Sequence, residues 1–303
     1  MSQKITPFLW FDTQALEAAK FYTSIFPNSS IHRREQFENS GPDENQTVQI
    51  VSFVLDGQEF QAMNAGPLFK INPSISFFVK CNSREEVDTY YHKLIEGGSA
   101  LMPLGKYDWS EHFGWVADKY GVTWQIMLHD QWPIVHRITP ALLFTKEHFG
   151  KAEKALNLYT SLFKNAPLSR GVAESRGVSI DTYQKIPAGE NEGKILFAEC
   201  TLEDSHLILM DGPGTHEFAF NEGVSLMVDC ADQAEVDHFW NGLIADDGEE
   251  SQCGWLRDAC GVSWQIVPKA LNECLARDTS GNVMKAMLGM KKLIVSELEA
   301  AAR

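Results

Sequence analysis

The chain has 303 residues, of which 44% are hydrophobic and 22% charged, a composition typical of a globular protein of about two domains. The net charge of −15 comes without a dense Lys/Arg cluster, so we expect neither nucleic acid nor an anionic membrane surface as a partner. No long apolar run predicts a transmembrane helix, and residues 1–7 lack the pattern of a signal peptide. We therefore expect a cytoplasmic protein, monomeric or homodimeric.

The first half of the chain predicts alternating strands and helices. Asp56-Gly57 between two apolar runs is a strong hairpin signal, and Pro27 and Gly97-Gly98 end the two helical patterns. The predicted elements are, in order, strand 8–11, helix 15–26, strands 48–55 and 59–64, strand 75–81, helix 84–96, and strands 114–117 and 122–128. We interpret this order as two βαβββ modules, each with one strand that the apolar pattern does not locate.

The same elements recur in the second half. The segment that runs from Gly114 through Asp118 to Ile126 returns 140 residues later, from Gly254 through Asp258 to Ile266, with eight identical positions. Weaker echoes, such as Ile5-Thr6-Pro7 in 138–140, keep the same order. Such self-similarity predicts a repeated architecture. We predict two domains, 1–132 and 133–268, followed by a helical tail at 269–303.

The two copies differ in length at three places. The second copy has additional residues around 146–150 and 175–192, and the first is longer between Leu101 and His112. Loops tolerate insertion and often carry sites, so the longer segment of the first copy is a candidate site, with a neutral surface insertion as the alternative.

Six cysteines lie far apart, at Cys81, Cys200, Cys230, Cys253, Cys260 and Cys274. No C-x-x-C pair occurs, and the nearest two lack the His partners of a zinc site. We expect reduced thiols, most of them in the core.

Several segments carry a family resemblance. The tandem βαβββ order with a closing D-x-x-G-x-x-W strand resembles the vicinal-oxygen-chelate superfamily of glyoxalases, bleomycin-resistance proteins and extradiol dioxygenases. Residues 5–12, 55–58, 64–67, 220–222 and 253–258 and the tail at 283–292 resemble its PhnB-like, demethylubiquinone-methyltransferase-like family. The resemblance implies an α+β fold, with tandem modules forming two glyoxalase-like half-barrel domains around ligand cavities.

The resemblance also implies where metal ligands would lie. Chelating members place His, Gln or Glu at four positions, which fall near Ile5, Gln61, Ser74 and Gln125 in the first copy and near Ile138, Leu207, Gly223 and Gln265 in the second. A further His of PhnB-like relatives corresponds to Ser52 and Glu199. Zinc, nickel and iron sites need three or four imidazole, carboxylate or thiolate ligands. We therefore predict no bound metal and no lactoylglutathione lyase activity.

Ligand-binding candidates are mostly aromatic. We expect the concave face of the first sheet to be lined by Trp10, Tyr22, Phe60, Trp115 and Trp124. An apolar pocket there would take a small flat or apolar ligand; an aromatic core is the alternative. Asn64 precedes Gly66-Pro67 and either fixes a ligand carbonyl or caps a turn. The candidates are Trp10, Tyr22, Asn64, Tyr107, Trp109, Trp115, Trp124 and Gln125, with Phe60 beside them.

Catalytic candidates are fewer. His112 with Glu111 and Asp108 could act as a general base, or the group is a solvated charged loop. Cys253 could be a nucleophile, but the sequence shows no base or helix N-terminus beside it.

Methyl transfer needs a nucleotide-sized cofactor site. No glycine-rich turn follows a predicted strand, so we expect no cofactor. We predict a metal-independent small-molecule binding protein. The alternatives are an enzyme on the same scaffold (a lyase, a dioxygenase or, least favoured, a methyltransferase) and a structural or partner-binding role of the tail.

The tail carries apolar residues at helical spacing, beginning after Gly281-Asn282. An isolated helix of this length is marginal in water, so we expect packing against the domains to order it. The residues of this stripe are Val283, Met287, Met290, Leu293, Ile294 and Leu298.

Overall fold

The computed structural model describes residues 3–37, 47–129, 134, 136–166 and 177–303. The first repeat contains β1 (Ile5–Phe11), α1 (Ala15–Ile25), β2 (Ser30–Phe37), β3 (Val48–Leu55), β4 (Gln58–Asn64), β5 (Ile75–Cys81), α2 (Arg84–Ile95), β6 (Ser99–Tyr107), β7 (Ser110–Ala117) and β8 (Thr123–Leu128). The second contains β9 (Ile138–Phe144), the 3₁₀ turn η1 (Lys146–His148), α3 (Ala152–Asn165), β10 (Val178–Lys185), β11 (Ile195–Leu202), β12 (Ser205–Asp211), β13 (Val224–Cys230), α4 (Gln233–Ile244), β14 (Glu249–Glu250), β15 (Trp255–Arg257) and β16 (Ser263–Pro268). The tail forms α5 (Lys269–Arg277), α6 (Asn282–Leu288) and α7 (Val295–Ala301).

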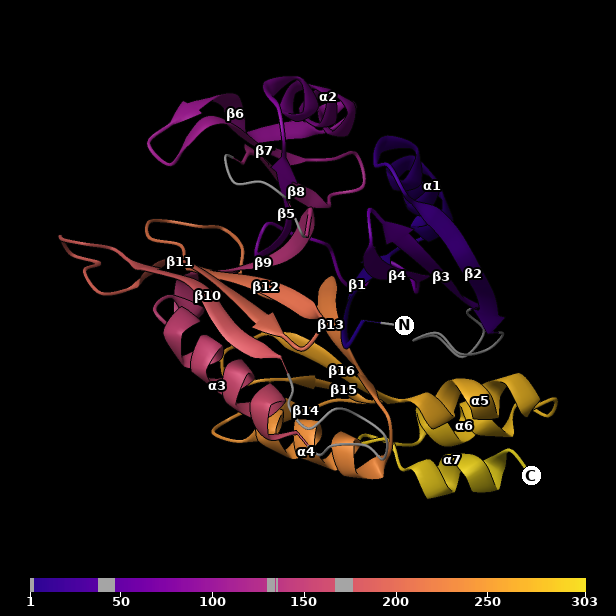
Figure 1. The fold of residues 1–303 in the computed structure, drawn as a ribbon. Helices are drawn as coiled ribbons and strands as arrows, with labels where there is room; N and C mark the ends of the chain where they lie inside the picture. Colours follow the sequence, from indigo (N-terminus) through magenta and orange to yellow (C-terminus); the bar gives the residue numbers. More distant parts are fainter. Residues whose placement is uncertain (1–2, 38–46, 130–133, 135, 167–176) are drawn as a thin grey trace.

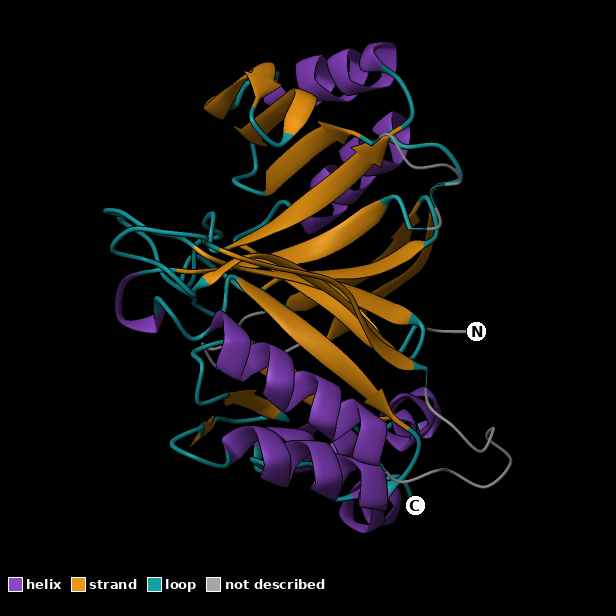
Figure 2. Ribbon diagram, turned by 60° about the vertical axis from the view of Figure 1, so that its left-hand side comes forward, coloured by secondary structure: helices purple, strands orange, loops and turns teal. Residues whose placement is uncertain are grey.

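The strands form two 8-stranded sheets that cross between the repeats. Sheet A has the order β14-β15-β16-β13-β1-β4-β3-β2, and sheet B has the order β10-β11-β12-β9-β5-β8-β7-β6. Each sheet therefore joins one module of each repeat, through antiparallel pairs β1–β13 and β5–β9. Figures 1 and 2 show the strands at the centre, with α1 and α2 on one side and α3 and α4 on the other.

The closing hairpins confirm the repeat. Trp115 pairs with Gln125 across β7 and β8, and Trp255 pairs with Gln265 across β15 and β16. The predicted boundaries at 132 and 268 fall after β8 and at the end of β16, and the division into two autonomous domains stays a prediction.

The main core lies inside each repeat, where helices cover the faces of its two modules. In the first repeat Tyr22 of α1 packs against Trp124 of β8, with ring centroids 5.2 Å apart. Tyr159 of α3 meets Trp264 of β16 in the same way at 5.0 Å. Because these side chains alternate with those on the opposite face of each strand, the second face of each sheet is left to line a concavity between the repeats.

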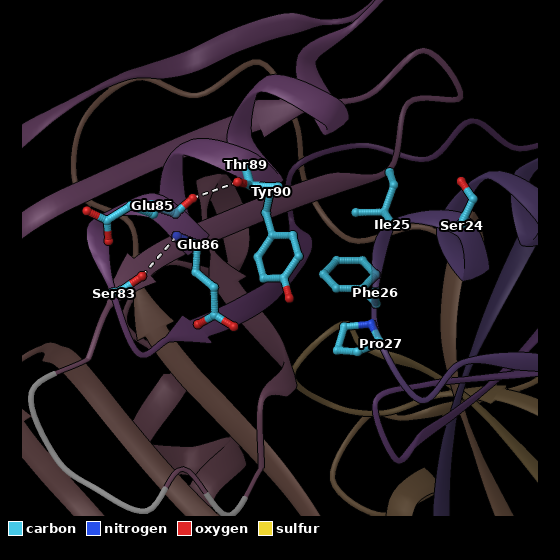
Figure 3. Close-up of a pocket in the computed structure, with 9 residues that line it drawn as sticks. All are labelled: Ser24, Ile25, Phe26, Pro27, Ser83, Glu85, Glu86, Thr89 and Tyr90. Carbon is cyan, nitrogen blue, oxygen red and sulfur yellow. Dashed lines mark hydrogen bonds between the residues drawn. The ribbon is translucent and has the colours of Figure 1, made fainter.

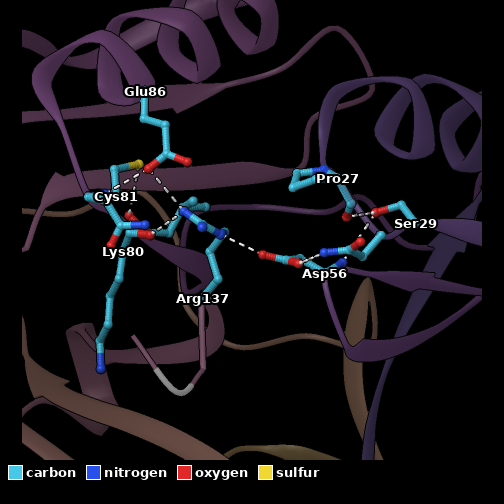
Figure 4. Close-up of polar contacts among 10 residues, drawn as sticks. Pro27, Ser29, Asp56, Lys80, Cys81, Glu86 and Arg137 are labelled. Carbon is cyan, nitrogen blue, oxygen red and sulfur yellow. Dashed lines mark hydrogen bonds and ion pairs between the residues drawn. The ribbon is translucent and has the colours of Figure 1, made fainter. Parts of the chain in front are cut away.

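Two equivalent ionic contacts link the start of each repeat to the other repeat. Arg137 donates to Asp56, to Glu86 and to the carbonyl of Lys80, as Figure 4 shows. At the equivalent position Lys4 donates to the carbonyl of Asp229 and, at 2.7 Å, to the buried carboxylate of Glu235. Removing one partner of such a buried pair leaves an uncompensated charge, so both contacts constrain the junction.

Two strands, β2 and β6, were not predicted. β2 has the sequence SIHRREQF and stands at the edge of sheet A, mostly exposed, so it lacks an apolar pattern. β6 contains Pro103 and is one of the two edge strands of sheet B. The segment between Leu101 and His112, interpreted above as a loop, is therefore largely a hairpin of β6 and β7.

The tail is helical but does not form one helix. α6 begins at Asn282 as predicted and ends at Leu288, because Gly289 follows and the amides of Cys253 and Gly254 bind the carbonyls of Met290 and Lys291. Most of the predicted stripe forms a small separate core with Leu271 and Cys274 of α5. No helix in the described part of the chain combines the length and the apolarity needed to cross a membrane.

Candidate functional site

A cavity of about 580 Å³ lies on the concave face of sheet A, between the repeats. Its floor comes from both halves of the chain, including Phe8 and Gln61 of the first repeat and Met227 and Gln265 of the second. Phe8 is paired with Gln61 across β1 and β4, while Met227 is paired with Gln265 across β13 and β16. The site therefore depends on the pairing of β1 with β13, and neither repeat builds it alone.

The walls of the cavity are aromatic and flexible apolar side chains. Trp10 meets Phe69 edge to face at 5.0 Å and Trp255 at 6.2 Å, and its indole N–H donates to the carbonyl of Gly66. Met63 and Met227 add adaptable thioethers. The volume and lining are typical of a site for a small organic molecule.

The tail helices close the cavity. Leu271, Asn272 and Leu275 of α5 and Met284, Met287 and Leu288 of α6 line it. Figure 1 places α5 and α6 beside the ends of β15 and β16 and opposite β2 and β3. Leu68 and Leu288 remain exposed, at 63% and 39%, so apolar side chains also surround the mouth.

Eight polar or charged residues line the cavity: Arg33, Glu35, Gln61, Glu222, Ser251, Gln252, Gln265 and Asn272. The carboxamide of Gln61 makes no hydrogen bond to another described residue. Gln265 donates through Nε2 to Ser225 at 2.9 Å, which leaves its carbonyl oxygen as an acceptor. Arg33 and Glu35, on the edge strand β2, pair with each other at 2.6 Å.

The concave face of sheet B is filled by its own side chains. Phe78, Phe113 and Phe197 pack there with Met102 and Tyr107 of the β6–β7 hairpin. The hairpin that is longer in the first copy thus covers sheet B, whereas β14 in the second copy has two residues and the tail covers sheet A. The two concavities are closed by different elements.

A second hollow is an open groove of about 600 Å³ between the end of α1 and the start of α2 (Figure 3). Its serine and threonine hydroxyl groups are engaged locally, since Ser24 donates to the carbonyl of Phe21, Ser83 accepts from the amide of Glu86 and Thr89 donates to the carbonyl of Glu85. Glu86 itself receives Arg137. The cavity of sheet A, which is more enclosed and is lined by aromatic side chains, is therefore the candidate site.

Comparison with known proteins agrees with this architecture. The family model for 3-demethylubiquinone-9 3-methyltransferase matches residues 3–127 and 136–267, one match for each repeat. The chain belongs to this family.

Solved structures similar to this chain include a PhnB protein from Bacillus cereus, which is 44% identical. The match covers 42% of this chain and 100% of that protein, with a TM-score of 0.38. Glyoxalase I from Zea mays is 10% identical over 87% of this chain and 91% of its own, with a TM-score of 0.56. The latter shares the fold, that of the vicinal-oxygen-chelate superfamily. A comparison with curated proteins gave no match.

The residues present do not fit a metal ion of that superfamily. The predicted metal-ligand positions of each repeat are divided between the two sheets. Gln61 lies in the cavity of sheet A, whereas Gln125, which donates a hydrogen bond to Ser76, belongs to sheet B. Gln61 and Gln265 offer the cavity only neutral carboxamides. Within the described ranges no group of three or more His, Cys, Asp or Glu side chains is arranged to hold a metal.

A nucleotide-sized methyl donor is not accommodated either. In the turn from β9 to α3 the amide of Gly150 donates to Asp211, and the turns from β1 to α1, from β5 to α2 and from β13 to α4 contain no glycine. They therefore lack the close backbone approach that a phosphate-binding turn requires.

Several predicted ligand-binding residues lie elsewhere. The predicted concave placement of Tyr22, Trp124 and Phe60 is wrong, because all three are fully buried in the core on the helix-covered side. Each strand alternates its faces, so Trp124 points away from the face that its neighbour Gln125 occupies. Trp10 lines the cavity, and its ligand-binding role stays a prediction.

The remaining candidates divide between a helix cap and sheet B. Asn64 accepts from the amide of Ala15 at 2.7 Å, where α1 begins. Tyr107 and Trp109 stack at 5.1 Å on the β6–β7 hairpin, and Trp115 lies beneath them on the concave face of sheet B. None of these four residues lines the sheet A cavity.

The candidate catalytic side chains do not gather in one site. His112 contacts Asp88 of α2 at 2.6 Å, on the helix-covered side of β7. Glu111 is exposed, and the hydrogen bond that Lys106 donates to it lowers the pKa of its carboxyl. Cys253 lines the cavity, but burial raises the pKa of its thiol, which disfavours the nucleophilic thiolate.

Phe8, Phe69, Trp255 and the methionines of α6 line the cavity and were not predicted from the sequence. The internal repeat could have indicated two cavity residues, since Trp255 and Gln265 stand 140 positions after the candidates Trp115 and Gln125. No sequence pattern predicted that the sheets cross between the repeats or that the tail folds over the cavity.

Proposed function

We propose that the protein binds a small, largely apolar aromatic molecule in the sheet A cavity, without a metal ion or a cofactor. The observation that carries this proposal is the partly enclosed cavity of about 580 Å³, whose walls are mostly aromatic, aliphatic and thioether groups and whose floor carries two carboxamides. Burial of an apolar ligand against such walls supplies most of the binding free energy.

A neutral fluorescent probe tests the proposal. The protein is dialysed against a chelator and titrated with N-phenyl-1-naphthylamine, whose emission rises in apolar surroundings. We expect saturable binding of one probe per chain. Elemental analysis of a native preparation should find no stoichiometric zinc, nickel or iron, and one bound metal per chain would overturn the metal-independent mechanism.

The repeat provides a matched variant that fills the cavity. Phe78 and Phe197 occupy in sheet B the registers that Met227 and Ile50 occupy in sheet A. The double variant Ile50→Phe/Met227→Phe therefore reproduces packing that this fold already accepts, and it should weaken probe binding at least roughly tenfold.

A control separates the cavity from exposed apolar surface. Trp109 is 59% exposed on the sheet B hairpin, so Trp109→Ser removes a surface aromatic without touching the cavity. If Trp109→Ser lowered probe binding and the double variant did not, the probe would be bound at the surface and the proposed site would be wrong.

A further inference from the structure

The cavity floor differs from its counterpart in sheet B at one polar position. Gln61 pairs with Phe8 across β4 and β1, and Ile208 pairs with Ala141 at the same register of β12 and β9. The fold therefore accepts an isoleucine where sheet A has a glutamine. A carboxamide at this position is not needed to build the sheet, and in sheet A it faces the cavity.

The Gln61 carboxamide offers one acceptor and two donors, and no described side chain or backbone group uses them. Gln265 offers its carbonyl oxygen to the same cavity, because its Nε2 is held by Ser225. Desolvating these groups with a purely apolar ligand would cost free energy, whereas a ligand that donates and accepts would satisfy them.

The charges around the cavity disfavour an anionic ligand. Among the described residues that line it, Arg33 is the cation, and Glu35 neutralises it at 2.6 Å. Glu222 adds a carboxylate at the wall. A ligand carboxylate would therefore lose its hydration without gaining a free positive partner.

We propose that the ligand is an uncharged aromatic molecule with a hydroxyl group, of the phenol class, whose hydroxyl is held by Gln61 and Gln265. This proposal rests on the proposed function of the same cavity. The ring lies against Trp10, Phe69 and Trp255, and the hydroxyl donates to one carboxamide oxygen while it accepts from Nε2 of Gln61.

A matched ligand series tests the class with the unaltered protein. 2-Naphthol, 2-methylnaphthalene, 2-methoxynaphthalene and 2-naphthoate are competed against N-phenyl-1-naphthylamine. We expect 2-naphthol to bind roughly tenfold more tightly than 2-methylnaphthalene, the methoxy compound to fall between them, and 2-naphthoate to bind most weakly. Equal affinities for 2-naphthol and 2-methylnaphthalene, or a preference for 2-naphthoate, would overturn the class.

The variant Gln61→Ile tests the position. It should reduce the preference for 2-naphthol over 2-methylnaphthalene to less than about threefold, while 2-methylnaphthalene binds at least as tightly as before. Gln184→Ile, on the exposed edge strand β10, makes the same chemical change away from the cavity and should keep the full preference. A full preference in Gln61→Ile would overturn the role of Gln61.

The two proposals fail differently. If the fluorescent probe does not bind, the cavity is not an apolar binding site and both proposals fall. If the probe binds but the series shows no preference for the hydroxyl, the ligand class is wrong and the binding function stands.

Discussion

Asp118 and Asp258 are buried carboxylates at equivalent positions of the two closing hairpins. Each accepts from a tryptophan indole N–H at 2.9 Å and from two backbone amides in its turn. Asp258 also accepts from the hydroxyl of Tyr159 at 2.6 Å. The D-x-x-G-x-x-W pattern therefore joins the last turn of each repeat to the core.

Replacing either carboxylate with its amide should destabilise the protein. In Asp118→Asn the new NH₂ group faces the N–H of Trp124, so two donors oppose each other in a buried site. We expect a loss of about 1–3 kcal/mol in the free energy of unfolding. Asp258→Asn should cost more, because the Tyr159 hydroxyl loses its acceptor as well. Urea denaturation of both variants measures this order, and an equal or reversed order would contradict the account.

His206 gives a pH dependence to sheet B. Burial and the neighbouring His136 lower the pKa of His206 from 6.5 to about 4. The folded state therefore resists protonation, and the stability that neutral His206 contributes above pH 6.5 is lost as the pH falls towards 4. Burial acts in the opposite sense on Asp118, whose pKa is raised to about 6, so a variant is needed to separate the two groups.

The variant His206→Asn should remove this dependence. The difference in unfolding free energy between the wild type and His206→Asn should change in favour of the variant as the pH falls from 6.5 to 4. Denaturation at several pH values measures it. A difference that stays constant over this window would show that His206 does not titrate between the two states.

Among the elements, strands and helices with a buried face were predictable, and edge strands were not. Ile75–Cys81 and the helix beginning at Arg84 agree with their predicted bounds to within one residue. β2 and β6 were not predicted, because both are edge strands that are mostly exposed to solvent and their sequences carry no apolar alternation. Trp124 was misplaced because sequence alternation does not reveal which face of a strand meets a helix, and Tyr22 was misplaced because α1 packs on that helix-covered face.

The tail helices are held by packing and by contacts to sheet A and α4. Gln233 accepts from the amide of Val295 and donates to the carbonyl of Leu293, and Lys292 pairs with Asp237 at 2.8 Å. Leu293 is fully buried in the small tail core. The stripe was therefore correctly predicted to be buried, but it packs mostly within the tail.

Leu293→Ala should loosen the cavity roof. The substitution removes a buried side chain and should cost about 2–5 kcal/mol locally, which detaches part of the tail before the sheets unfold. Amide exchange in 269–303 should speed up, and probe affinity should fall. Truncation after Pro268 should go further, with loss of probe binding and lower solubility, because the lining of the cavity becomes exposed. Unchanged probe affinity after truncation would show that the tail does not form the roof.

The two repeats are held together by the strand pairs β1–β13 and β5–β9. A polypeptide limited to residues 1–132 keeps the core of its repeat but presents β1 and β5 as unpaired edges. Such edges template pairing with another chain. We expect this fragment to form a two-fold dimer in which β1 of one copy pairs with β5 of the other.

Light scattering after size exclusion measures the mass of that fragment. A mass of twice the fragment is expected, with weak probe binding because the tail is missing. A stable monomer would show that the crossed sheets are not required for each repeat to fold.

The joining of the crossed strands within one chain has an evolutionary consequence. In a two-fold dimer of identical subunits every substitution appears in both concavities, so a change that improves one site also alters the other. Covalent linkage removes this constraint and holds each repeat near its partner at an effective concentration on the order of millimolar. Gln61 can therefore coexist with Ile208, and the pairing persists at dilutions that would separate a dimer. One concavity is free to adapt to new ligands while its duplicate preserves the assembly.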